Sequence, residues 1–423
     1  MDTFIPLFFI FTNMILRLVI FIGIFALLEF YAFTAVKTVF RDKWIWYLYG
    51  IVSICAFVLI VYGFLKFDRS VGQTQQTLFT VGLLLFFLIP KIVIALPLLI
   101  EDIFRIMKGC VYFFTGDKSP EGFLPERRKF VSQVALALAA IPFSALLYGV
   151  TKGKYNFKVL KQRLEFSDLP DAFDGFKILQ ISDIHSGSFD DKEKIEYAIN
   201  LINEQEADIF LFTGDIVNSL ATEMHPWIDT FKNIKPFKYG KYSILGNHDY
   251  GEYLQWSSEA ARNENFVAIK DLHRQIGFDL MLNQHKWLEK GNQKIALIGV
   301  ENWGHNFKQK GDINKASEGI TETDFKIVMS HDPSHWDMIL KNHPKHFQLT
   351  LSGHTHGFQF GIEIPGIKWS PVQYVYKQWA GMYENFGRYI NVNRGFGFHA
   401  YPGRIGIWPE ITVIELKKSQ KTA

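Results

Sequence analysis

Five short segments rich in histidine and aspartate lie between residues 182 and 356. They read Ser182-Asp183-Ile184-His185, Thr213-Gly214-Asp215, Gly246-Asn247-His248-Asp249, Ser330-His331-Asp332 and Ser352-Gly353-His354-Thr355-His356. Imidazole, carboxylate and carboxamide groups suit manganese, iron or zinc at sites without thiolate. Two such cations can clamp the attacking and leaving oxygens of a displacement at phosphorus, and they lower the pKa of bound water toward about 7. The residue types therefore predict a metal centre suited to phosphoryl chemistry.

Each segment follows a short apolar run that is typical of a buried strand. The five runs are Lys177–Ile181, Ile209–Phe212, Tyr242–Leu245, Lys326–Met329 and Leu349–Leu351. Such runs, ending in small or polar residues, present the next side chains at the C-terminal ends of the strands. We expect these five ends to bring the candidate ligands together.

The rest of the chain beyond residue 151 continues an alternation of strands and helices. Tyr155–Phe166 alternates apolar and polar residues, as an edge strand or hairpin arm does, and Lys192–Asn203 has a helical apolar stripe. Further strands are expected at Lys294–Val300, Tyr389–Val392 and Ile411–Leu416. This pattern predicts an α/β sandwich in which two sheets meet at a core, with helices outside.

The order of the five segments resembles the motifs of the calcineurin-like metallophosphoesterase superfamily. The resemblance spans about Phe176 to Glu415 and includes all five motifs. It implies a binuclear centre for two divalent metal ions, manganese, iron or zinc. The implied ligands are Asp183, His185 and His356 for the first ion, Asn247, His331 and His354 for the second, and Asp215, with the nucleophilic hydroxide, as the bridge between them.

The resemblance also implies an acid for the leaving group. His248 stands where the family keeps a histidine that binds a phosphoryl oxygen and protonates the leaving group. Asp249 stands where a carboxylate would orient that imidazole, although an aspartate after a strand also commonly caps the next turn.

The C-terminal segments are similar to the membrane-associated phosphodiesterase branch of YkuE-like and YaeI-like proteins. They include Asn393-Arg394-Gly395 and Pro402-Gly403-Arg404. Arg394 and Arg404 could bind a substrate anion or make structural hydrogen bonds. Phe358 stands where the family usually has a second glycine, so its ring could narrow the pocket or contact a lipid group.

All 13 histidines lie at or beyond His185. This distribution indicates that the predicted metal centre belongs to the C-terminal part of the chain. Eight of them fall outside the five segments, and for these we expect solvated or core roles. They are His225, His273, His285, His305, His335, His343, His346 and His399.

Residues 1–150 are predicted to form a membrane region, with the catalytic domain at 151–423. Four apolar runs there are long enough to cross a bilayer, namely Phe4–Val36, Trp44–Leu65, Leu78–Ile100 and Val131–Val150. Charged residues inside these runs, Arg17, Glu29 and Lys91, indicate either a transport pathway or, as we favour, snorkelling and pairing within the bundle. A net charge of +3 and the lack of a nucleic-acid motif argue against a nucleic-acid partner.

The loop charges predict that the catalytic domain faces away from the cytoplasm. Lysine and arginine are concentrated in the first and third loops, and four spans then place both termini outside. The segment Glu126–Val131 also resembles a twin-arginine export signal, although flanking charge of an ordinary helix explains the same residues.

Two classes of function remain open. The first is a phosphoesterase for a phosphodiester or pyrophosphate in a lipid-linked or envelope substrate. The second is a transporter or sensor in which the membrane helices carry out transport or sensing and the phosphoesterase domain is regulatory. An acid at His248 favours the enzyme, because a purely structural metal site would not need it.

Overall fold

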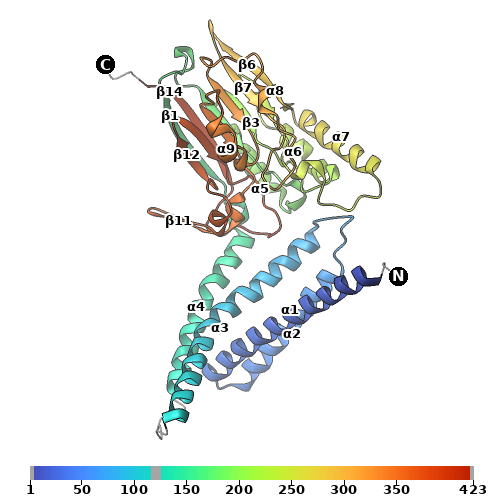
Figure 1. Cartoon of the computed structure of the whole chain (residues 1–423), viewed down its shortest axis with the longest axis vertical. Helices are drawn as coiled ribbons and strands as arrows, with labels where there is room; N and C mark the ends of the chain where they lie inside the picture. Colours follow the sequence, from blue (N-terminus) through green and yellow to red (C-terminus); the bar gives the residue numbers. More distant parts are fainter. Residues whose placement is uncertain (1–3, 116–124, 420–423) are drawn as a thin grey trace. The chain divides into compact units, whose positions relative to one another are not determined.

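A computed structural model describes residues 4–115 and 125–419 (Figure 1). Contacts divide the chain into two units, and the first comprises Met1–Lys66 and Thr80–Leu147. The second comprises Phe67–Phe79 and Tyr148–Ala423. The segment Phe67–Phe79, expected in the membrane region, therefore belongs with the C-terminal unit.

The first unit is built from long apolar helices. They are α1 (Phe4–Val39), α2 (Lys43–Leu65), α3 (Gln75–Thr115) and α4 (Pro125–Thr151). Each contains a stretch long and apolar enough to cross a membrane. Helix α3 extends beyond its predicted span, Leu78–Ile100, at both ends. The twin-arginine-like segment lies at the start of α4. Lys118, one of the basic residues expected between the third and fourth spans, lies outside the described residues.

Two of the charged residues predicted inside the spans pair with each other. Lys91 Nζ lies 2.5 Å from a Glu29 carboxylate oxygen and 2.7 Å from Ser53 Oγ, and Ser53 Oγ donates to the same Glu29 oxygen at 2.6 Å. A buried charge is tolerated in an apolar bundle when it is paired and hydrogen-bonded. The pairing favours a structural role for these two residues over a transport pathway. The side chain of Arg17 is not described.

The second unit contains two six-stranded sheets and a small hairpin. The first sheet has the order β1 (Lys158–Phe166), β14 (Glu410–Lys418), β2 (Lys177–Ile181), β3 (Ile209–Phe212), β4 (Lys241–Ser243) and β5 (Asp279–Leu280). The second has the order β12 (Gly381–Asn385), β13 (Arg388–Val392), β9 (Leu349–Ser352), β8 (Lys326–Met329), β7 (Gln293–Gly299) and β6 (Gln284–Lys290). The hairpin pairs β10 (Ile362–Ile364) with β11 (Ile367–Trp369).

The two sheets pack face to face, and helices cover their outer faces. Side chains such as Ile178 and Leu211 from the first sheet share a core with Leu297 and Ile327 from the second. Alternate side chains of β2 and β3 point the other way and pack against α5, α6 and α7. The helices outside the sandwich are α5 (Lys192–Asn203), α6 (Ile228–Lys232), α7 (Glu259–Gln275), α8 (Ile313–Ala316) and α9 (Pro333–Met338). The predicted α/β sandwich is confirmed.

Strand β1 shows which of its two sequence interpretations holds. It lies at the edge of the first sheet and pairs in parallel with β14, so it is an edge strand and not a hairpin arm. The next strand, β2, runs antiparallel to β14 and parallel to β3 and β4. Parallel β2, β3 and β4 bring their C-terminal ends to one edge, where three of the five candidate segments begin.

Candidate metal centre

The candidate ligands lie on tight turns that leave the strand ends. Asp183, His185, Asp215, His354 and His356 all have positive φ, between 47° and 75°. Such backbone conformations are uncommon for residues other than glycine and cost free energy unless the surroundings impose them. Their concentration at five of the predicted ligands indicates that the fold holds these side chains in a required orientation.

The first three predicted ligands come together as a buried group. Asp183, His185 and His356 have ligand atoms that all lie within 4.8 Å of one another. His356 Nε2 is 3.3 Å from Asp183 Oδ1, and both Asp183 and His185 are buried. The structure therefore brings these three predicted ligands together, and their role as ligands of one ion stays a prediction.

The second group gathers around Asn247. Its Oδ1 lies 2.7 Å from His354 Nδ1 and 3.2 Å from His331 Nε2. Asp215, His331 and His354 likewise have ligand atoms within 4.8 Å of one another. Asp215 Oδ2 is 3.1 Å from His331 Nε2 and 3.6 Å from His185 Nε2, so it lies between the two groups.

The hydrogen bonds on the far side of the rings show that this donor set fits cations. His185 Nδ1 faces Asn218 Oδ1 at 3.1 Å and His331 Nδ1 faces the Thr213 carbonyl oxygen at 2.7 Å, so both nitrogens donate. Burial lowers the pKa of His185 well below its usual value, so its Nε2 is unprotonated and faces Asp215. Burial also works to lower the pKa of His331, but attraction to Asp215 and Asp183 outweighs it and raises that pKa to about 10, so in the absence of a cation Nε2 of His331 carries a proton. Positive charge between these rings and the carboxylates, a proton or a metal ion, stabilises the arrangement, and outward hydrogen bonds of this kind are typical of metal-binding histidines.

The two aspartates are held in the anionic form. Burial works to raise the pKa of Asp183, but attraction to the His356 and His331 imidazoles outweighs it and lowers the pKa below its usual range. Burial opposes ionisation of Asp215 as well, and attraction to the His331 and His248 imidazoles again lowers its pKa. Both side chains are therefore available as carboxylate ligands.

His248 lies beside the first group, and a carbonyl oxygen fixes its ring. Its Nδ1 lies 2.7 Å from the Asn218 carbonyl oxygen, and its backbone N–H donates to Asp215 Oδ1 at 2.8 Å. Among the described residues, none is hydrogen-bonded to Nε2 on the opposite side of the ring. This is the arrangement expected of a group that exchanges a proton with a bound substrate.

Asp249 does not orient His248. Its carboxylate accepts hydrogen bonds from the backbone N–H groups of Asp215, Ile216 and Gly246, at 2.9, 2.9 and 2.8 Å. Burial, together with the charge of Asp215, raises the pKa of Asp249 to about 7. The alternative of a turn-capping residue is therefore the better description, because the side chain fastens the turns that carry Asp215 and Asn247.

The two arginines considered for substrate binding are engaged within the protein. Arg394 pairs with Glu363 and with Glu410, each at 2.5 Å. Arg404 is fully buried and donates to the Gly397 carbonyl oxygen. Guanidinium groups that already have carboxylate or carbonyl partners are not free to bind a substrate anion, so the structure favours their structural alternative.

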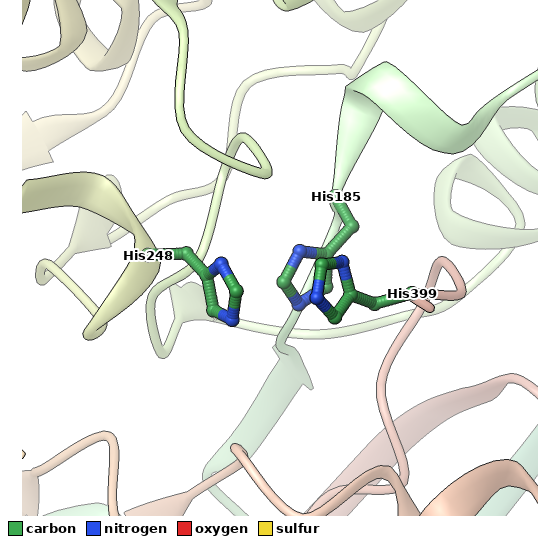
Figure 2. Close-up of side chains that lie close together, drawn as sticks. All are labelled: His185, His248 and His399. Carbon is green, nitrogen blue, oxygen red and sulfur yellow. The ribbon is translucent and has the colours of Figure 1, made fainter. Parts of the chain in front are cut away.

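One histidine for which a solvated or core role was expected, His399, lies in the centre. The His399 ring is stacked on His185, with centroids 4.8 Å apart, and its centroid is 4.5 Å from that of His248 (Figure 2). Its Nδ1 faces Asn218 Oδ1 at 3.1 Å. His185, His248 and His399 form a third group of close ligand atoms. Its only sequence signal is its position shortly after β13, on the loop Asn393–Arg404.

Asn218 was also missed. Its side-chain oxygen faces His185 and His399, and its backbone oxygen faces His248. Asn218 thus fixes the orientation of three imidazoles from one position. It follows Asp215 by three residues, but a single asparagine in a loop carries no motif.

Comparisons with known proteins agree with this geometry. Residues 13–154 match the family described as "Probable Calcineurin-like phosphoesterase, transmembrane domain", and residues 176–358 match "Calcineurin-like phosphoesterase". The chain is 32% identical to the uncharacterized metallophosphoesterase YkuE of Bacillus subtilis, across 69% of this chain and 98% of that protein. The chain belongs to the calcineurin-like phosphoesterase family, whose members use divalent metals to hydrolyse phosphoesters.

Two further relatives match the chain over a similar extent. One is a zebrafish protein named transmembrane protein with metallophosphoesterase domain, 27% identical over 68% of this chain and 63% of that protein. The other is phosphodiesterase YaeI of Escherichia coli, 26% identical over 69% of this chain and 98% of that protein. The protein is accordingly an integral membrane metallophosphoesterase.

Proposed function

We propose that the protein is a binuclear metal-dependent phosphodiesterase or pyrophosphatase for a lipid-linked or envelope substrate. The observation that carries the proposal is the position of Asp215 between two ligand groups, with His248 beside it. A bridging carboxylate and an adjacent acid are what an in-line displacement at phosphorus requires.

The residues of this chain have distinct tasks in that reaction. Asp183, His185 and His356 would hold one ion, Asn247, His331 and His354 the other, and Asp215 both. When bound, the ions supply a nucleophilic water near neutral pH and neutralise charge on the phosphoryl group. His248 donates through Nδ1 to the Asn218 carbonyl oxygen, so it carries a second proton, on Nε2, only as the imidazolium. Burial lowers its pKa, and the anionic phosphoryl group of a bound substrate would stabilise the imidazolium, which would then pass the Nε2 proton to the leaving oxygen.

The surface beside the centre supports a substrate with an apolar part. Helical turn η7 (His356–Gln359) leads from the ligand His356 into the hairpin of β10 and β11. Large apolar side chains are exposed there, and they are Phe358, Phe360, Ile362, Ile364 and Ile367. An apolar surface of this kind in a membrane protein can contact the acyl part of a lipid-linked phosphodiester. The name of the relative YaeI, a phosphodiesterase, supports the same reaction type.

The rival function, a transporter or sensor, receives less support. The charged residues Glu29 and Lys91 of the described helices are paired with each other. The candidate metal ligands, by contrast, lie in adjoining groups with His248 beside them. We therefore retain hydrolysis as the function and membrane attachment as the role of the helices.

Hydrolysis assays on the purified full-length chain, supplied with manganese, iron or zinc, test this proposal. We expect phosphodiesters and pyrophosphate-linked lipids to be cleaved faster than the corresponding monoesters. Faster cleavage of monoesters would contradict the diesterase assignment, whereas no cleavage of any phosphoester would contradict the function itself.

We further propose that the catalytic domain lies on the extracytoplasmic side. The proposal rests on six lysine or arginine residues between Ile100 and Phe130, against two in the second loop, and on four spans. Alkaline phosphatase fused after Ala423 is expected to be active. An inactive phosphatase together with a fluorescent fusion at the same position would place the domain in the cytoplasm.

A further inference from the structure

The segment that joins α2 to α3 is a structural part of the catalytic unit. Leu78, at its end, is buried in the core that also contains residues of α5 and α7. The Gln255 N–H donates to the Arg69 carbonyl oxygen at 3.0 Å, and Gly72 lies against the Leu254 side chain. A connection between two membrane helices thus contributes to the folded catalytic domain.

Gln73 makes two hydrogen bonds from this segment to the loops around the metal centre. Its Oε1 accepts from the backbone N–H of Ala400 at 2.7 Å, and its Nε2 donates to Ser188 Oγ at 3.0 Å. Gln75 adds a bond from Nε2 to the Ser188 carbonyl oxygen at 3.3 Å. One amide side chain therefore bridges two loops that are 212 positions apart in sequence.

Both partners of Gln73 adjoin the three-imidazole group. Ser188 Oγ accepts from Asn218 Nδ2 at 3.1 Å, and Asn218 holds His185, His248 and His399. Ala400 directly follows His399 and has a φ of 60°, a left-handed conformation that its own side chain does not favour. A conformation of this kind persists only where neighbouring contacts impose it, and the Gln73 side chain is one such contact.

We propose that Gln73 is a positioning residue that holds His399 against the site of phosphoryl transfer. The inference rests on the proposed function, since it gives His399 the task of contacting the bound substrate beside His248. The segment between α2 and α3 then completes the active site, because its side chain fixes the loop on which His399 lies. Displacement of an active-site group by about 1 Å can cost up to about 10²-fold in rate.

The first test combines substitutions at positions 73 and 399 in the full-length protein. Gln73→Leu keeps the approximate volume and removes both hydrogen bonds, so we expect kcat for a phosphodiester to fall by about 10-fold with unchanged metal content. Gln73→Glu keeps the acceptor for Ala400 and should recover part of the loss. Val71→Ala, an exposed position in the same segment, is the matched control and should match the unmodified protein.

The double variant distinguishes positioning from a general loss of stability. If Gln73 acts through His399, Gln73→Leu should have little further effect on kcat in a His399→Ala background. An equal loss of kcat in both backgrounds would overturn the proposal, and so would an unchanged kcat in the single variant.

Hydrogen exchange measured by mass spectrometry tests the contact independently of activity. In Gln73→Leu, peptides that cover Ala400 and Ser188 should exchange faster, and peptides that cover His331 should not change. Unchanged exchange at Ala400 would refute the positioning role even if activity fell. If exchange at Ala400 becomes faster but the unmodified protein cleaves no phosphoester, the contact of Gln73 with Ala400 is supported and the proposed function is refuted. The role of His399 in contacting substrate is then refuted as well.

Discussion

Replacing Asp215 with asparagine is expected to reduce hydrolysis by at least about 10²–10³-fold and to lower the metal content of the purified protein. The carboxylate Oδ2 lies 3.6 Å from His185 Nε2 and 3.1 Å from His331 Nε2, so it serves both ligand groups. Asparagine has nearly the same shape but no negative charge, and it therefore weakens the site for both cations. Metal content by mass spectrometry and turnover of a phosphodiester measure the two effects.

Asp191→Asn is the matched control for this substitution. Asp191 caps α5 through a hydrogen bond to the Lys194 N–H, and asparagine caps helices equally well. Both turnover and metal content should be unchanged in this variant. Normal turnover with full metal occupancy in Asp215→Asn would remove the bridging role and with it the binuclear interpretation.

His248→Ala should lower turnover by about 10²–10⁴-fold while both metals stay bound. His248 is placed beside the ligands by its backbone bond to Asp215 Oδ1, and its ring is held by the Asn218 carbonyl oxygen. Removal of the ring leaves the metal-binding groups in place and takes away the proton donor. His225→Ala, at an exposed histidine, is the control and should retain full activity.

The dependence of the activity loss on the leaving group tests whether His248 acts as an acid. Nitrophenolate leaves readily without a proton, so its esters should lose less activity in His248→Ala than alkyl esters, whose leaving groups need protonation. An equal loss for both kinds of ester would contradict the role as an acid and would instead indicate that His248 stabilises charge on the phosphoryl group.

The strands that carry the candidate site could be predicted from local sequence pattern. Strands β2, β3 and β8 have the bounds expected from their apolar runs, since buried strands show in composition and length. The polar residues after those strands then had to meet near one edge of the sandwich. The family resemblance named the seven candidate ligands among these residues, and the structure gathers them in adjoining groups, while their role as metal ligands stays a prediction.

The parts that depend on contacts between loops were not accessible from sequence. His399 and Asn218 meet because the loop after β13 folds back over His185. No local sequence pattern predicts that path of the loop. The Asp249 carboxylate accepts hydrogen bonds from three backbone N–H groups and so stabilises the turns that carry Asp215 and Asn247. The Gly-Asn-His-Asp motif alone does not show whether this carboxylate binds the backbone or the His248 ring. The contacts of Gln73 likewise join a segment between membrane helices to loops far along the chain.

The measurement that tests the central claim most directly is the turnover of a phosphodiester as a function of metal bound per chain. The full-length protein would be stripped with a chelator and then titrated with manganese, iron or zinc, with metal and activity measured on the same samples. The two ligand groups around Asp215 predict no turnover in the stripped protein and full activity only as occupancy reaches two ions per chain. Undiminished turnover in metal-free protein, or full activity at one ion per chain, would contradict a binuclear phosphodiesterase.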